Sequence, residues 1–379
     1  MTGHYLDNAA TTPVRMEAAQ AAMKAMTEEW GNPSARHALG SQAAERVKQW
    51  RSEVAAGLGC LPEEVVFTSC GTESDNWAIR AAAELGKRKG KHIITTAIEH
   101  AAVLEPCRAL EREGYEVTYL QPDRSGNITA RQVKEALRPD TILVSMMLVN
   151  NELGSIYPIA DIAKGLKAVN EKTLLHTDAV QGFLKVPFSA KALGADFIAI
   201  SGHKIGAPKG IGALYIGPRV RNPRPLLPGG GQEMGLRSGT EATAQIAGFA
   251  KAVELRWDHL EDKLHHMAEV KAYAVEKLTA IPDLQIIGSG KAPHVLSVSM
   301  AGWPSQNVVN DLGSQGICVS AGSACHHGKS SQVVSALGLP KRVAAGVIRL
   351  SFGPETTFAE IDACAEALRN HHDHRMPML

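Results

Sequence analysis

The fold is decided by the stretch Phe197–Gly212, which reads FIAISGHKIGAPKGIG. Its first residues, Phe197–Ile200, form a short apolar run that is typical of a fully buried strand. The run leads into Ser201, Gly202, His203 and Lys204, and then into a loop with glycines at positions 206, 210 and 212. A lysine at the end of a buried strand is a candidate Schiff-base residue, because desolvation disfavours the charged ammonium and frees the amine as a nucleophile. An ordinary surface lysine is the alternative.

Similar apolar runs recur through the first two-thirds of the chain, and helical patterns separate most of them. The further strands are predicted at Val65–Thr68, His92–Ala97, Glu116–Leu120, Ile142–Leu148, Leu174–Thr177 and Ala213–Ile216. The helices are predicted at Pro13–Glu29, Ser34–Leu58, Ser74–Lys87, Ala101–Glu113, Thr129–Leu137 and Ile159–Val169. This alternation predicts an α/β fold in which helices flank a mostly parallel, seven-stranded sheet.

The pattern changes near Thr240. One long, charged helical tract is predicted from Glu241 to about Leu278. Strands are then expected at His294–Met300, Ile317–Ser320 and Val347–Ser351, and helices at Ser305–Leu312, Gln332–Leu337 and Phe358–Asn370. We therefore predict a large α/β domain over residues 13–255 and a smaller α+β domain built from residues 1–12 and 256–379. The last residues, 371–379, are expected to be frayed.

Composition narrows the classes of function. The 379 residues are 44% hydrophobic and 21% charged, which is typical of a globular protein, and 40 Lys and Arg against 39 Asp and Glu give a net charge of +1. This balance gives no excess of positive charge of the kind that binds nucleic acid or an anionic membrane. Residues 1–13 lack the basic and apolar regions of a secretory signal, so we expect a cytoplasmic, reducing location in which most of the six cysteines are free thiols.

Several common cofactor motifs are absent from the sequence. Neither G-x-G-x-x-G nor a complete P-loop occurs, and H-E-x-x-H and C-x-x-C are also missing. The dense Cys/His cluster at Cys325, His326 and His327 is consecutive, so the three side chains cannot easily converge on one ion, and no metal site is expected.

Two other segments suit the same site as Lys204. The segment 67–74, FTSCGTES, ends a strand and opens a helix, which is a ready phosphate site; a plain turn capped by Thr72 is the alternative. The segment 174–181, LLHTDAVQ, brings Asp178 to a strand end, where it can pair with a pyridinium nitrogen or simply cap a helix. Ligands of open α/β sheets bind outside the carboxyl ends of strands, so the three segments together favour a pyridoxal phosphate site.

With these motifs the sequence resembles the cysteine desulfurases, in the class V aminotransferase group of fold type I pyridoxal phosphate enzymes. The resemblance rests on TESDN at 72–76, EH at 99–100, VNNELG at 149–154, HTDAVQ at 176–181, SGHK at 201–204, GGGQE at 229–233, RSGTE at 237–241 and SAGSAC at 320–325. It implies a homodimer that acts on L-cysteine and supplies a sulfur-acceptor protein for iron–sulfur cluster assembly or thiolation.

The resemblance also implies roles for individual residues. Lys204 would form the Schiff base and move the Cα proton, His100 would stack on the ring and assist proton transfer, and Asp178 and Gln181 would contact the ring nitrogen and the phenolic oxygen. The remaining residues would bind anionic groups. The phosphate would be bound by Gly71, Thr72, Ser201 and His203, together with Thr240 of the neighbouring subunit. The substrate carboxylate would be bound by Asn151 and Arg349.

The motif around Cys325 distinguishes among the candidate reactions. It lies in the small-residue run Ser320–Cys325, and the cationic side chains that follow it are expected to favour the thiolate. By the resemblance, this thiolate attacks the sulfur of the substrate bound to the cofactor, which leaves alanine and a cysteine persulfide. Cys70, in contrast, stands where the family usually has glycine. A selenocysteine lyase, another aminotransferase or lyase, and a sulfur- or metal-carrying protein are the alternatives.

Overall fold

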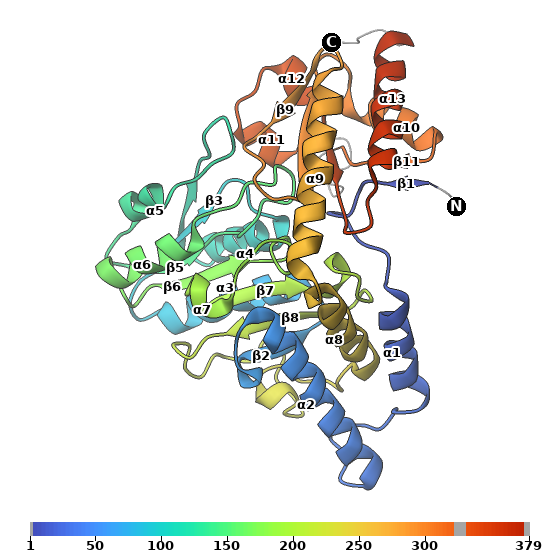
Figure 1. The fold of residues 1–379 in the computed structure, drawn as a ribbon. Coiled ribbons are helices and arrows are strands. Elements are labelled where there is room, and N and C mark those ends of the chain that lie inside the picture. The colour runs from blue at the N-terminus through green and yellow to red at the C-terminus, as the bar shows by residue number, and fades with distance from the viewer. Residues whose placement is uncertain (1–2, 322–330, 375–379) are drawn as a thin grey trace.

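A computed structural model describes residues 3–321 and 331–374 of the chain. Its largest sheet has seven strands in the order β2-β8-β7-β6-β5-β3-β4 (Figure 1). The strands are β2 Val65–Thr68, β3 His92–Thr96, β4 Glu116–Leu120, β5 Thr141–Ser145, β6 Leu174–Asp178, β7 Phe197–Ser201 and β8 Gly212–Ile216. Strand β8 runs antiparallel to both of its neighbours, whereas the other pairs are parallel. The predicted α/β fold with a mostly parallel seven-stranded sheet is confirmed.

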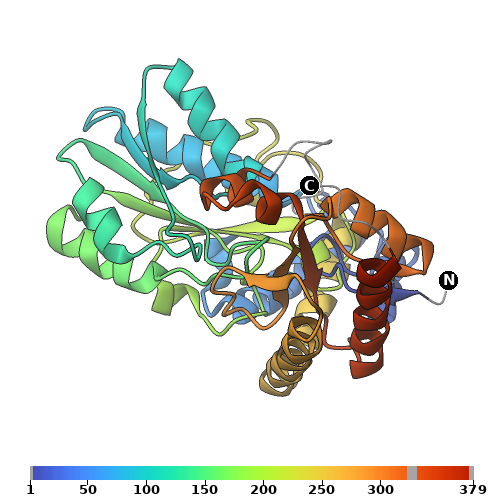
Figure 2. The ribbon, with the colours of Figure 1, turned by 90° about the horizontal axis from the view of Figure 1, so that it is seen from above.

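Helices cover both faces of this sheet (Figure 2). Successive residues of a strand point to opposite faces, so Phe197 packs into one apolar cluster and Ile198 into the other. The cluster that includes Phe197 is covered by α3 and α4, and the cluster that includes Ile198 by α2, α6 and α8. The helices of this part are α1 Met16–Thr27, α2 Ala38–Leu58, α3 Gly71–Gly86, α4 Ala101–Arg112, α5 Ala130–Ala136, α6 Ile159–Val169, α7 Ala190–Leu193 and α8 Thr243–Trp257.

A second, smaller group of strands follows in the chain. The antiparallel strands β9 Leu284–Ile287, β10 Val295–Met300 and β12 Val347–Ser351 form a three-stranded sheet, and β1 His4–Tyr5 pairs in parallel with β11 Ile317–Cys318. Their helices are α9 Leu260–Thr279, α10 Ser305–Ser314, α11 Gln332–Ala336, α12 Lys341–Ala345 and α13 Phe358–His374. Leu6 joins the apolar cluster of this part. The domain boundary itself stays a prediction.

Two details of the sequence prediction were wrong. The tract from Glu241 to Leu278 is not one helix, because α8 and α9 are separated at Asp258 and His259, and His259 has a left-handed backbone with φ of 49°. The chain also does not fray from residue 371, because α13 continues to His374 and buries His371, whose Nδ1 lies 2.7 Å from Asp311 Oδ2. Among the described residues, no helix is long and apolar enough to cross a membrane.

Candidate active site

A cavity of about 300 Å³ lies at the carboxyl ends of β6 and β7. Its walls also include the start of α3, the N-terminal segment around Ala9 and a side chain from β12. Ten of the predicted site residues line it: Gly71, Thr72, His100, Asn151, Asp178, Gln181, Ser201, His203, Lys204 and Arg349. The structure therefore brings together residues that are up to 278 positions apart in the sequence (349 minus 71).

One wall of the cavity offers donors for an anion. Helix α3 begins at Gly71, where a Cβ atom would lie 2.7 Å from Val180 Cγ2, so a side chain at this position would crowd the wall. The hydroxyl of Ser201 is buried and has no partner among the described residues. A buried hydroxyl without a partner is costly, and together with a helix N-terminus it suits a phosphate group.

His203 stands at the same wall in a fixed orientation. Its Nδ1 lies 3.0 Å from the hydroxyl of Thr11, and its carbonyl accepts from the backbone and the hydroxyl of Thr12. Burial, with a smaller contribution from Lys204, lowers the pKa of His203 to about 4. At neutral pH its ring is therefore uncharged and acts as a hydrogen-bonding group.

Asp178 reaches the cavity from the end of β6. The side chain is buried, and its Oδ1 accepts a hydrogen bond of 2.9 Å from the backbone N–H of Val180. Burial raises the pKa of Asp178, while the nearby His100 and Lys204 oppose that rise. A carboxyl group in this position gains from a positively charged partner, and a protonated ring nitrogen supplies one.

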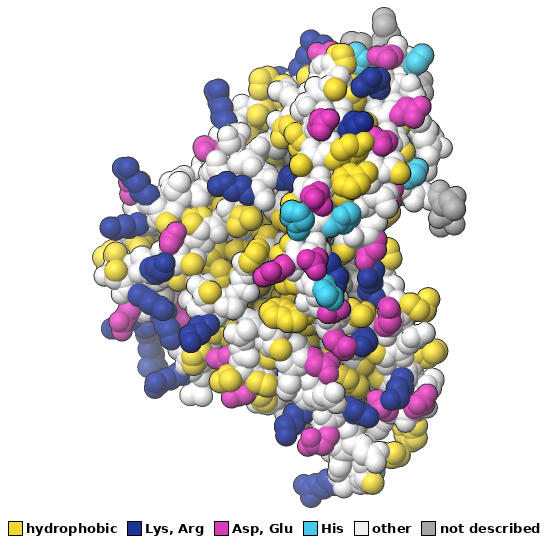
Figure 3. Space-filling view, in the orientation of Figure 1, with side chains coloured by type: hydrophobic (Ala, Val, Ile, Leu, Met, Phe, Trp, Pro, Cys, Tyr) yellow, Lys and Arg dark blue, Asp and Glu magenta, His cyan; other side chains and the backbone are white. Residues whose placement is uncertain are grey.

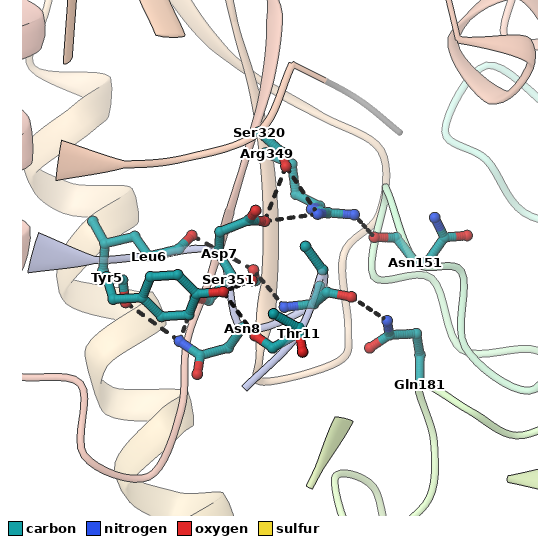
Figure 4. Close-up of polar contacts among 12 residues, drawn as sticks. Tyr5, Leu6, Asp7, Asn8, Thr11, Asn151, Gln181, Ser320, Arg349 and Ser351 are labelled. Carbon is teal, nitrogen blue, oxygen red and sulfur yellow. Dashed lines mark hydrogen bonds and ion pairs between the residues drawn. The ribbon is translucent and has the colours of Figure 1, made fainter. Parts of the chain in front are cut away.

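The amine of Lys204 is held by the N-terminal segment. Its Nζ donates to the carbonyl oxygens of Ala9 and Ala10, at 2.8 and 2.7 Å. The side-chain Nε2 of Gln181 also donates to Ala9, at 2.8 Å (Figure 4). Neither of these acceptors is a carboxylate, so the amine is oriented by neutral carbonyl oxygens.

Arg349 supplies a buried cation at another part of the cavity. Its two terminal nitrogens donate to Asp7 Oδ1 at 2.8 Å, to the carbonyl of Asn151 at 2.9 Å and to the hydroxyl of Ser320 at 3.2 Å (Figure 4). Its Nε is buried and has no partner among the described residues. The guanidinium is thus held in place and keeps a donor for an anionic ligand.

His100 is fixed by the backbone. It is the N-cap of α4, and its Nδ1 accepts from the N–H of Ala102 at 3.1 Å, so in the neutral ring Nε2 carries the proton. The preceding Glu99 is buried and accepts from the hydroxyl of Thr96 and the backbone N–H of Met147. Burial raises the pKa of Glu99 to about 8.

Thr240 and Cys325 are the remaining predicted site residues. Thr240 is exposed and is not part of the cavity wall, so it stays a predicted contribution to the site of a neighbouring subunit. Cys325, predicted as the sulfur nucleophile, lies outside the described residues. In the described part of the chain no group of His, Cys, Asp and Glu is arranged to hold a metal ion.

The aminotransferase class V model matches residues 4–364, nearly the whole chain. The chain belongs to the class V aminotransferase family. Cysteine desulfurase 2 of Trichormus variabilis is 44% identical over 362 residues, which are 94% of this chain and 90% of that protein. Cysteine desulfurase IscS of Methanosarcina thermophila is 40% identical over 368 residues, 96% of this chain and 90% of its own.

The fold agrees with that membership. A solved NifS-like protein superposes with a TM-score of 0.93 at 36% identity, and the match covers 99% of this chain and 100% of that one. The cavity of this class V aminotransferase fits pyridoxal phosphate, the cofactor of the family: the unpartnered Ser201 hydroxyl suits the phosphate, and the buried Asp178 suits the ring nitrogen. Lys204 is the amine within the same cavity.

Sequence reasoning missed three groups of this class V aminotransferase site. Asp75 lines the cavity, and its Oδ1 lies 3.2 Å from His176 Nε2; burial and the nearby Asp178 raise the pKa of Asp75 well above its usual value. Asp7 holds Arg349, and Lys185 holds Gln181. Asp75 lies inside the motif at 72–76, so its position was a signal, whereas nothing in the sequence pairs Asp7 with Arg349. Lys185 follows an apolar run and gave none.

Proposed function

We propose that this class V aminotransferase is a pyridoxal phosphate-dependent cysteine desulfurase. The carbon–sulfur bond of L-cysteine breaks, the departing sulfur forms an S–S bond with Cys325, and Cβ takes up a proton to give L-alanine. The observation that carries the proposal is the single cavity that joins Lys204, Asp178 and Arg349, three groups suited to an amine, a ring nitrogen and a carboxylate. The similarity to curated cysteine desulfurases supports the choice of substrate.

The cofactor, when bound, supplies an electron sink for the electron pair that stays on the carbon side when the carbon–sulfur bond breaks. Asp178 favours the protonated ring nitrogen, and Gln181 donates to the phenolic oxygen. Gly71, Thr72, Ser201 and His203 bind the phosphate. Asn151 and Arg349 bind the substrate carboxylate, and Lys204 and His100 move the protons.

Three described cysteines are unsuited to take the sulfur. Burial raises the pKa of Cys60, Cys107 and Cys364 to about 12, so their thiols hold their protons at neutral pH. The five described cysteines are all free. Residues on either side of Cys325 are tied to the cavity: Ser320 contacts Arg349, and the hydroxyl of Ser331 donates to Glu152 Oε2 at 2.5 Å, next to Asn151. These anchors support Cys325 as the acceptor.

We further propose a cytoplasmic homodimer that passes its sulfur to an acceptor protein for iron–sulfur cluster assembly or thiolation. Thr240 would complete the phosphate site of the partner subunit. Its exposure supports this role, as do the exposed apolar side chains in and near α1, a region that Figure 3 shows with several yellow groups at its surface. These side chains are Met16, Met23, Met26, Trp30 and Leu39. Exposed apolar clusters of this kind are typical of interaction surfaces.

Intact-mass measurement after treatment with L-cysteine tests the reaction. We expect one added sulfur on the wild-type protein with alanine as the product, and no stable sulfur on Cys325→Ser. Cys318→Ser, which changes an exposed thiol, is the control and should gain sulfur as the wild type does. Sulfur on Cys325→Ser, or alanine without a persulfide, would contradict the assignment. A marked preference for selenocysteine over cysteine would favour the lyase alternative.

A further inference from the structure

A second buried lysine lies next to the cofactor cavity. Lys185 is 3% exposed and stands four residues after Gln181, and its Nζ donates to Gln181 Oε1 at 3.1 Å. Burial lowers the pKa of Lys185 well below its usual value, and the neighbouring cations Lys204 and Arg256 lower it further. Burying such an amine is costly, so its position calls for an explanation.

The contacts of Gln181 suggest what Lys185 does. A side-chain amide can exchange its oxygen and its NH₂ group by a half-turn, and its neighbours decide between the two orientations. Here both neighbours fit the same orientation, since the Lys185 amine donates to Oε1 and the Ala9 carbonyl requires an N–H, which Nε2 provides at 2.8 Å. The reversed amide would bring Oε1 against the Ala9 carbonyl and lose that bond.

The same carbonyl also holds the reactive lysine. Lys204 Nζ donates to Ala9 at 2.8 Å, so a continuous set of hydrogen bonds runs from Lys185 through Gln181 and Ala9 to Lys204. Gln181 lines the cavity, whereas Lys185 is not part of its wall. Lys185 therefore contacts the wall of the cavity through Gln181.

We propose that Lys185 is a positioning residue that fixes the orientation of the Gln181 amide, so that its NH₂ group serves as the donor to the phenolic oxygen of pyridoxal phosphate. The inference rests on the proposed function. A donor at the phenolic oxygen stabilises negative charge there and lowers the pH midpoint of the visible absorption of the bound cofactor. Without Lys185 only the Ala9 carbonyl, among the described residues, opposes the half-turn, so the amide oxygen occupies that place more often and the midpoint rises.

A double-mutant cycle followed by absorbance tests this role. The variants are Lys185→Met, Gln181→Leu and the pair of them, each loaded with pyridoxal phosphate and titrated with pH. We expect Lys185→Met to raise the midpoint by about one pH unit. In the Gln181→Leu background the same change should shift it by less than about 0.3 unit, because the residue acts through Gln181.

The design separates positioning from a structural effect. The cycle is repeated with Lys185→Gln, so that the test needs only one of the two Lys185 variants to fold. Lys191→Met, at an exposed lysine of α7, is the control and should leave the midpoint unchanged. An unchanged midpoint in Lys185→Met, or an equal shift in both backgrounds, overturns the inference and leaves the proposed function standing. A wild-type protein that shows no visible band with pyridoxal phosphate overturns both.

Discussion

The two terminal nitrogens of Arg349 already donate to Asp7, Asn151 and Ser320. A planar guanidinium can keep these contacts and still offer Nε, whereas the single ammonium of lysine cannot. At the scale of the residue, the shape of this side chain therefore matters as much as its charge.

Replacing Arg349 by lysine tests that argument. We expect Arg349→Lys to raise KM for L-cysteine by about tenfold to a hundredfold, because a hydrogen bond to a charged group contributes about 1.5–3 kcal/mol. The fall in kcat should be smaller than the rise in KM. Steady-state kinetics on the purified protein measures both, and Arg112→Lys, at an exposed site of α4, is the control. An unchanged KM would remove Arg349 from carboxylate binding.

Glu99 gives a prediction about pH. Its pKa is raised from 4.5 to about 8, mainly by burial, so between these values the folded protein holds a proton that the unfolded chain has lost. Stability from this group is therefore complete below about pH 4.5 and falls as the pH rises towards 8, by at most about 1.4 kcal/mol per pH unit.

Glu99→Gln cannot lose that proton, so the free energy of unfolding should decline less steeply in this variant than in the wild type between pH 5 and 8. Urea unfolding at several pH values measures the two slopes. Other titrating groups are common to both proteins and cancel in the comparison, and Glu105→Gln, at an exposed site of α4, should keep the wild-type slope. Equal slopes in wild type and Glu99→Gln would show that Glu99 is ionised in the folded state.

Several residues that line the cavity could be predicted because they lie in contiguous motifs at strand ends. Ser201, His203 and Lys204 come from one such segment, and the geometry of a parallel sheet brings it to Asp178. The supporting contacts could not be predicted in this way. Asp7 meets Arg349 across 342 positions, and only folding decides that pairing.

At the scale of the element, the break between α8 and α9 shows a limit of periodicity. No glycine or proline marks the junction, and both flanking stretches have helical character, so the sequence suggests one helix. The structure turns at His259, whose φ of 49° is left-handed. A residue with a side chain is strained in this conformation by about 1–2 kcal/mol.

His259→Gly should therefore increase the free energy of unfolding by up to about 1 kcal/mol, since glycine tolerates a positive φ and the entropy of the unfolded chain offsets part of the gain. His265→Gly is the matched control in α9, where the same change in a regular helix should lower stability by about 1 kcal/mol. Urea or thermal unfolding of both variants provides the comparison. A loss of stability in His259→Gly would mean that its side chain contributes more than the strain costs.

At the scale of the whole molecule, one group of the proposed site is displaced from the rest. Thr240 is exposed and lies outside the cavity, although its motif was expected to bind the phosphate. The seven-stranded sheet could be predicted from alternating patterns within one chain, but an intermolecular contact leaves no such pattern. The resemblance alone suggested that Thr240 reaches a partner.

Heterodimers can decide whether the sites are shared. A dimer of one Thr240→Val subunit and one Lys204→Ala subunit would contain one intact site, since Lys204 of the first subunit meets Thr240 of the second. Co-expression with two different tags isolates this species. We expect it to show about half of the wild-type desulfurase activity, while the Lys204→Ala homodimer is inactive and the Thr240→Val homodimer binds the cofactor about tenfold less tightly.

The control heterodimer carries both substitutions in one subunit and none in the other. Its only subunit with Lys204 faces a partner without Thr240, so shared sites predict activity no better than half that of the Thr240→Val homodimer. If Thr240 instead served its own subunit, the control would be the half-active species and the first heterodimer would be impaired. Shared and unshared sites therefore predict opposite activities for the two heterodimers, and activity alone shows whether each site is built from one chain or from two.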